Sequence, residues 1–189
     1  FIKQLTVAEM KKMWEPAAQG KVTKWNQVNP SWPDAPLKLF GPGADSGTFD
    51  YFTEAMVGKS KSSRGDFTAS EDDNVLVQGV SRDVNGLGYF GYAYYVENKD
   101  KLKALEVNGG SGCVAPTDAT IGDGSYKPLS RPLFIYPNTG NSKESPALAA
   151  YVDFYLANAA ALSAEVGYIP VPDALAQQQL SNWGSAVPR

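Results

Sequence analysis

The fold of this chain is decided by the stretch Phe40-Gly41-Pro42-Gly43-Ala44-Asp45-Ser46-Gly47-Thr48-Phe49. Before it, Leu37 to Phe40 alternates apolar and polar residues, which predicts a strand. After it, Thr48 to Val57 places its apolar residues close to one face, which predicts a helix ending at Gly58. A strand that enters a helix through a glycine-rich turn is typical of an α/β unit.

The same turn has the composition of an anion site. A helix start presents free backbone N–H groups at its positive end, and Ser46 and Thr48 add two hydroxyl donors. Gly47 carries no side chain that would block an approaching ligand. These features together predict an anion bound at the helix N-terminus. The alternative is that Asp45 or Ser46 only caps the helix.

Length and composition limit the function classes. The 189 residues suffice for one domain or one and a half, and a hydrophobic fraction of 43% indicates a globular chain. A net charge of −3 provides no excess of positive charge for binding nucleic acid. No apolar run approaches the roughly 20 residues of a membrane span. The start Phe1-Ile2-Lys3 resembles the middle of a sequence, so we expect a processed or truncated chain.

The absence of histidine limits the chemistry further. It excludes Ser-His-Asp and Cys-His catalysis and any metal site built on histidine. Cys113 is the single cysteine, so it forms neither a disulfide within this chain nor a thiolate zinc cluster, and we interpret it as structural. We therefore expect no enzyme activity, no catalytic residue, no metal site and no cofactor.

Further helices are predicted from their start signals. Thr6-Val7-Ala8-Glu9 is a capping box that opens a helix running to about Trp14. A second capping box, Ser70-Glu71-Asp72-Asp73, would open another helix, whose N-terminus could converge with that of the helix after Gly47. Ser145-Pro146 supplies a cap and a first-turn proline for a helix near the C-terminus.

The remaining predicted elements are shorter or less regular. Trp25 and Trp32, in a long loop over 15–36, are interpreted as packing residues rather than as a sugar-stacking platform. Gly86 to Gly91 lacks the full dinucleotide fingerprint. We expect strands at 86–91, 104–107 and 133–136, a helix beginning at 92, a loop over 108–130 and a last helix over 174–183.

Several of these stretches together resemble the phosphate-binding proteins of bacterial ABC-type phosphate importers. The resemblance covers nearly the whole chain. It rests on the 40–52 motif with Leu5-Thr6-Val7 and Trp14, Trp25-Asn26, Ala69 to Asn74, Gly86 to Tyr92, Arg131-Pro132-Leu133, and Val166 to Pro170. It implies a type II periplasmic-binding-protein-like α/β fold with a three-layer α/β/α domain.

The resemblance also implies a domain organisation. Residues 1–140 would be the second α/β domain, and 141–189 would be C-terminal helices that pack back on a first domain. Family members begin with a segment of that first domain, and this chain would start after it. The partners then expected are the missing N-terminal segment or a second fragment, which would cover an apolar face formed by Leu148, Tyr151, Tyr155 and Leu156.

Site residues follow from the same resemblance. Ser46, Gly47 and Thr48 would bind inorganic phosphate, with Asp45 beside them. Many relatives carry an arginine where this chain has Pro42, so we expect the charge to come from Arg64, although an isolated surface arginine is the more common case. Asp73 and Asn74 correspond to a helix start near the site in other members.

The implied function is binding of phosphate and its delivery to the membrane permease of a phosphate ABC transporter. The implied location is the periplasm, or the extracellular side in association with the membrane. No nucleic-acid partner is expected. Two alternatives stay open: an enzyme acting on a phosphorylated substrate, and a binding protein for another oxyanion such as sulfate. A carboxylate acceptor would favour phosphate, because phosphate keeps a proton near neutral pH.

Overall fold

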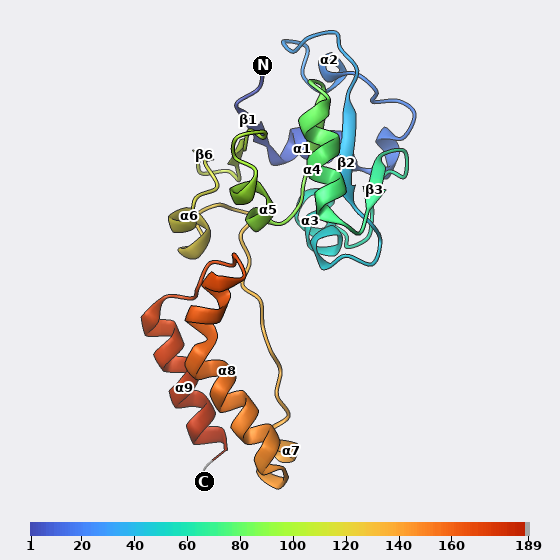
Figure 1. Cartoon of the computed structure of the whole chain (residues 1–189). Coiled ribbons are helices and arrows are strands. Elements are labelled where there is room, and N and C mark those ends of the chain that lie inside the picture. The colour runs from blue at the N-terminus through green and yellow to red at the C-terminus, as the bar shows by residue number, and fades with distance from the viewer. Residues whose placement is uncertain (188–189) are drawn as a thin grey trace.

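The computed structural model describes residues 1–187 and builds them from helices and two small sheets (Figure 1). The helices are α1 (Val7–Trp14), the 3-10 helix η1 (Pro16–Ala18), α2 (Trp25–Val28), α3 (Gly47–Val57), α4 (Asp73–Arg82), α5 (Tyr92–Glu97), α6 (Asp118–Gly122), α7 (Thr139–Glu144), α8 (Pro146–Glu165) and α9 (Asp173–Ala186). The strands are β1 (Gln4–Thr6), β2 (Lys38–Pro42), β3 (Thr68–Ser70), β4 (Gly86–Gly88), β5 (Glu106–Asn108) and β6 (Cys113–Val114).

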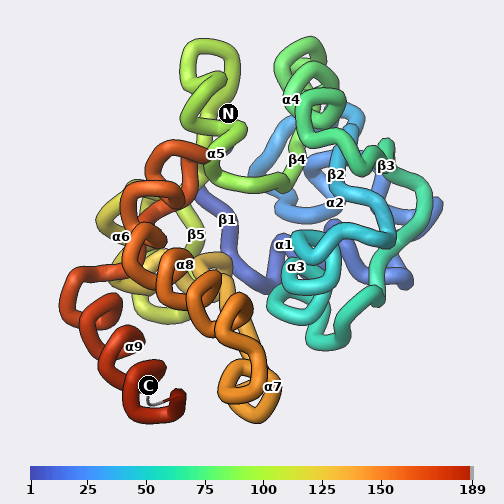
Figure 2. The backbone as a smooth tube through the Cα atoms, turned by 60° about the horizontal axis from the view of Figure 1, so that its bottom comes forward, coloured from blue at the N-terminus to red at the C-terminus, as the bar shows by residue number. Residues whose placement is uncertain are grey.

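The sheet that positions the site has the strand order β3-β2-β4, and both pairings are parallel. Because β2 is central, its side chains alternate between two covered faces. Phe40 meets Gly79 of α4 on one face, whereas Leu39 belongs to the core cluster with Trp14 of α1 and Phe52 of α3 on the other. Figure 2 shows α4 on one side of β2 and α1 with α3 on the opposite side. The predicted α/β class with three layers is confirmed.

A second sheet, in the order β1-β5-β6, joins the start of the chain to its middle. β1 pairs with β5 in parallel, and β5 pairs with β6 in antiparallel orientation. The strand predicted over 104–107 is observed over 106–108, and the region predicted as a loop contains β6 and α6. Cys113 lies in β6, half-buried, as a free thiol.

The helix starts follow the local signals closely. Thr6 and Glu9 form the predicted capping box, in which the Glu9 N–H donates to Thr6 Oγ1 at 3.1 Å and the Thr6 N–H donates to Glu9 Oε2 at 2.9 Å. α3 ends at Gly58 in the left-handed conformation, as predicted. The second capping box is wrong, because Asp72 rather than Ser70 caps α4. Ser70 still belongs to β3, where it pairs with Pro42.

The segment Leu133–Tyr136 was predicted as a strand and is not one in this structure. Its side chains are exposed, with Phe134 at 67% and Tyr136 at 87% of their full accessibility. Among residues 1–187 no neighbouring strand pairs with it, and an apolar run without a pairing partner does not form a ladder. The segment is an extended connection between the α/β part and the C-terminal helices (Figure 1).

The C-terminal helices α8 and α9 form a hairpin that projects from the α/β part in Figure 1. Its small core consists of Ala149, Val152, Trp183 and Val187, and the indole N–H of Trp183 donates to Asp153 Oδ1 at 2.9 Å. Leu148 and Leu156 pack on this core, while Tyr151 and Tyr155 are exposed. The expected apolar face is therefore only partly present. The predicted domain boundary at 140/141 remains a prediction.

Helix α8 is long and apolar enough to cross a membrane when judged by length and composition alone. That corrects the expectation from the sequence that no segment approaches this limit. The same test is passed by apolar helices that pack on other parts of a protein. Asp153 lies near the middle of α8 and is hydrogen-bonded to α9, which ties this helix to its neighbour in the hairpin.

Candidate functional site

The predicted anion loop lies at the carboxyl edge of the β3-β2-β4 sheet. It follows β2 and leads directly into α3, whose N-cap is Ser46. Two backbone hydrogen bonds shape it: Gly43 N–H donates to Ser70 O, and Ser46 N–H donates to Gly43 O, each at 3.2 Å. The carboxyl edge is where open parallel sheets bind their ligands, because loops and helix starts converge there.

The first turn of α3 has both a cap and free donors. Ser46 Oγ accepts the Thr48 N–H at 3.2 Å, so Ser46 does cap the helix. Within the described part of the chain, no acceptor is found for the N–H groups of Gly47 and Phe49. Gly47 is exposed and Thr48 is half-buried. The turn can therefore donate hydrogen bonds to an anion while its helix remains capped.

Two acidic residues stand close to this turn. Asp45 is exposed, and its N–H donates to Glu71 Oε1 at 3.4 Å. The Glu71 carboxylate lies directly against Gly43, in the space that a side chain at that position would need. Glycine at 43 thus allows the close approach of the loop to the end of β3. From the sequence, Glu71 was identified only as part of a capping box and of a stretch that carries the family resemblance, and no role at the site was predicted for it.

Asp73 and Asn74 lie at the start of α4, engaged in contacts of their own. The Asn74 N–H and side-chain amide both donate to Asp72 Oδ1, at 2.9 and 3.1 Å. Burial raises the pKa of Asp73, and the charges of Asp72 and Glu71 add to that rise, while a hydrogen bond from the Gly91 N–H opposes it. Asp73 therefore faces the end of β4, and its predicted role as a phosphate ligand remains a prediction.

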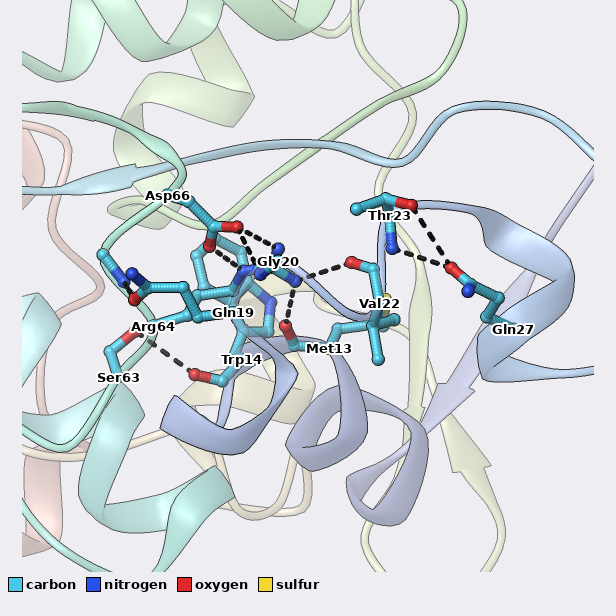
Figure 3. A network of polar contacts seen from close by, with 11 residues as sticks. Met13, Trp14, Gln19, Gly20, Val22, Thr23, Gln27, Ser63, Arg64 and Asp66 are labelled. Atoms are coloured by element: carbon cyan, nitrogen blue, oxygen red, sulfur yellow. Dashed lines mark hydrogen bonds and ion pairs between the residues drawn. The ribbon is translucent and has the colours of Figure 1, made fainter.

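Arg64 is not at the anion site. It follows α3 and precedes β3, so it lies at the amino edge of the sheet, opposite the loop. It is 4% exposed, and its guanidinium donates to Met13 O at 3.1 Å, to Val22 O at 2.9 Å and to the Asp66 carboxylate (Figure 3). The prediction of Arg64 as a phosphate ligand is corrected, because its donors are committed to internal acceptors.

The arginine near the turn is Arg131. Its Nη2 donates to Gly47 O at 3.4 Å, and its Cζ lies 5.0 Å from the ring centroid of Tyr51. Sequence reasoning used Arg131 only as part of a family resemblance and gave it no role. No local signal connects it to Gly47, because 84 residues separate the two in sequence.

A metal ion needs several ligating side chains close together within the part of the chain that the structure describes. No cluster of three or more histidine, cysteine, aspartate or glutamate side chains is found there. The site is thus an open turn of donors flanked by one cation and several carboxylates. Such an arrangement can bind a small oxyanion, and no nucleophile paired with a base is seen among its described residues.

Comparison with known proteins identifies similar chains. The model of the PBP superfamily domain matches residues 4–159. Protein SphX of Synechocystis is 55% identical over 173 residues, which cover 92% of this chain and 52% of SphX. The phosphate-binding protein PstS of Staphylococcus saprophyticus is 38% identical over 175 residues, 91% of this chain and 52% of PstS. The chain therefore spans about half the length of the curated relatives it matches.

A solved structure of a similar protein supports the same family relationship. The crystal structure of a possible phosphate binding protein from Planctomyces limnophilus superposes with a TM-score of 0.87 at 46% sequence identity. The match covers 99% of this chain and 66% of that one. The periplasmic-binding type of α/β fold expected from the sequence is thereby confirmed.

Proposed function

Because this chain belongs to the PBP superfamily, we propose that it binds inorganic phosphate for a bacterial ABC-type phosphate importer. The proposal takes the ligand from the relatives described as phosphate-binding proteins and places it on residues of this chain. The ligand residues proposed are Ser46, Gly47 and Thr48 at the start of α3.

One observation carries the proposal: the first turn of α3 has N–H groups, at Gly47 and Phe49, that find no acceptor among the described residues. Both point from the positive end of an 11-residue helix. The Thr48 hydroxyl adds a third donor of the same turn. A phosphate oxygen placed there would satisfy groups that water otherwise solvates.

The carboxylates beside the loop favour phosphate over sulfate. Glu71 accepts the Asp45 N–H and stands against Gly43, so an anion at the turn would meet a negative neighbour. Phosphate still carries a proton near neutral pH and can donate it in a hydrogen bond to a carboxylate. Sulfate has no such proton and would only be repelled. Sulfate is accordingly the control anion rather than a second candidate function.

Delivery to a membrane permease belongs to the same proposal, as does a location in the periplasm or outside the cell in association with the membrane. The relatives are described as phosphate-binding proteins, which favours binding without turnover. The turn is open on one side, because Gly47 and Asp45 are exposed. We therefore propose a second protein surface that covers the bound anion from the solvent side.

The test is a titration of inorganic phosphate into the 15N-labelled chain, followed by nuclear magnetic resonance. This method detects weak binding and reports each amide separately. We expect saturable shifts of the Gly47, Thr48 and Phe49 amides with phosphate and far smaller ones with sulfate at equal ionic strength. Shifts confined to other parts of the chain, or no saturable shift at millimolar phosphate, would overturn the proposed site.

A further inference from the structure

We infer that Arg131 supplies the positive charge to the phosphate bound at the start of α3, an inference that rests on the function proposed above. The turn needs a cation from elsewhere, because no lysine or arginine occurs between Lys38 and Lys59. Arg131 reaches it from a distant part of the chain, with Nη2 at 3.4 Å from Gly47 O.

Arg131 is held beside α3 by one tyrosine. The Tyr51 hydroxyl donates to Pro128 O at 2.6 Å and lies 3.5 Å from Ser130 O, which ties the segment before Arg131 to the helix. The guanidinium then lies over the Tyr51 ring, its Cζ 5.0 Å from the ring centroid, a favourable cation–π arrangement. Tyr51 is therefore the positioning residue for Arg131.

The charge of Arg131 is available to a ligand. The salt bridges among the described residues join Lys24 to Asp34, Lys61 to Asp50 and Arg64 to Asp66, and none of them uses Arg131. Among residues 1–187, its one hydrogen bond is the long contact to Gly47 O, so most of its five N–H donors have no acceptor in this part of the chain. This contrasts with Arg64, whose donors are occupied by internal acceptors.

Glycine at position 47 keeps the guanidinium next to the donors of the helix start. A Cβ at Gly47 would lie 3.5 Å from Arg131 Nη2, so the arginine packs against the bare backbone of this residue. From there a rotation of the side chain brings its planar fork to an anion at the Gly47 and Phe49 N–H groups. A fork of two parallel N–H donors matches two oxygens of one phosphate.

The experiment compares Arg131→Ala, Arg131→Lys and Arg131→Gln with the unchanged chain in the phosphate titration described above. The matched control is Arg82→Ala, which removes an exposed arginine from the last turn of α4, at the amino edge of the sheet. We expect phosphate affinity to fall about tenfold or more in Arg131→Ala and Arg131→Gln, as for a lost hydrogen bond between charged groups. The phosphate affinity should fall less in Arg131→Lys, and it should change less than twofold in Arg82→Ala.

A second readout separates a ligand from a merely structural residue. In the unchanged chain, added phosphate should shift the side-chain Nε–H resonance of Arg131, and the affinity should weaken with salt more steeply than in Arg131→Gln. Folding of each variant is checked by its amide spectrum, and Arg131→Lys and Arg131→Gln serve if Arg131→Ala fails to fold.

The outcomes distinguish this inference from the proposed function. If the unchanged chain shows no saturable shift of the Gly47 and Phe49 amides, the proposed function fails, and the inference fails with it. If the unchanged chain binds phosphate there and all three Arg131 variants bind within twofold of it, the proposed function stands and the assignment of Arg131 is overturned.

Discussion

Arg64 and Asp66 are joined side chain to side chain by two hydrogen bonds, although a single glycine separates them in sequence. The pairing points the guanidinium into the interior, where it also donates to Met13 O near the end of α1. The last carbonyls of a helix lack partners within the helix, and a cation is favourable at this negative end. Arg64 thus serves as a C-terminal cap for α1, and Asp66 balances its charge.

The first prediction concerns the stability that Asp66 contributes. The hydrogen bonds from Arg64 lower the pKa of Asp66 from 3.8 to about 2. Because the folded state has the lower pKa, the stabilisation is fully present above pH 4 and is lost as the pH falls towards 2. Asp66→Asn should lower the free energy of unfolding by about 2 kcal/mol at pH 7, as for lost hydrogen bonds to a charged group. Urea denaturation at several pH values measures this.

The control for Asp66→Asn is Asp34→Asn. Asp34 pairs with Lys24 at 2.8 Å, but its side chain is 62% exposed. An exposed ion pair is worth little, so Asp34→Asn should change the free energy of unfolding by less than about 0.5 kcal/mol. The role of the Asp66 charge would be contradicted if the free energies of unfolding of the unchanged chain and of Asp66→Asn differed by the same amount from pH 7 to pH 2.

The second prediction compares two glycines inside helices. Gly79 of α4 faces the ring of Phe40 so closely that a Cβ would overlap it, whereas a Cβ at Gly184 of α9 would meet no atom within 4 Å. Gly79→Ala should therefore destabilise the chain by about 1 to 3 kcal/mol through overpacking. Gly184→Ala should be neutral or stabilise by up to about 1 kcal/mol, because alanine is the better helix former. Thermal unfolding of both variants measures whether each substitution lowers or raises the stability. Equal effects of the two substitutions would mean that α4 does not pack on β2 as described.

Local signals in the sequence were sufficient where a structure depends on neighbouring residues. Thr6 with Glu9, Ser46 and Gly58 each mark a helix end whose partners lie within four residues, and all three ends are observed. The cap of α4 was misplaced by two residues, because the pairing of Ser70 with Pro42 extends β3 over the predicted cap. Strand pairing is a long-range interaction that a capping pattern does not contain.

Contacts between distant segments were not predictable in the same way. Leu133–Tyr136 has the composition of a buried strand, yet a strand requires a partner, which the pattern of one segment does not reveal. The assignment of the positive charge to Arg64 failed for a related reason. Both arginines are candidates by charge, and only the fold shows that one lies at the amino edge of the sheet and the other beside Gly47.

The third prediction tests the Thr48 hydroxyl. Thr48→Val keeps the shape of the side chain and removes its hydrogen bond to the proposed phosphate. The free energy of phosphate binding should weaken by about 1 to 3 kcal/mol, the contribution of a hydrogen bond to a charged group. The matched control is Thr68→Val, at the amino end of β3 and so away from the anion loop, and it should leave phosphate binding unchanged. Equal affinity of both variants for phosphate would show that the Thr48 hydroxyl does not bind the anion.

The last prediction separates capping of α3 from anion binding, because Ser46 has both roles in the proposal. Ser46 accepts the Thr48 N–H, and Asp72 accepts the Asn74 N–H in the same way at the start of α4. Serine and aspartate are about equally good N-caps, so Ser46→Asp and Asp72→Ser should both leave the free energy of unfolding within about 0.5 kcal/mol.

Phosphate binding should respond to only one of the two exchanges. Ser46→Asp places a carboxylate at the N–H groups where the anion would lie, so its charge repels phosphate and occupies the same donors. We expect the phosphate-induced shifts of the Gly47 and Phe49 amides to disappear in Ser46→Asp and to persist in Asp72→Ser. If Ser46→Asp still binds phosphate at these amides with unchanged affinity, the serine only caps the helix and the anion lies elsewhere. If it loses phosphate while its stability is unchanged, the helix start is a binding site in addition to a capped end.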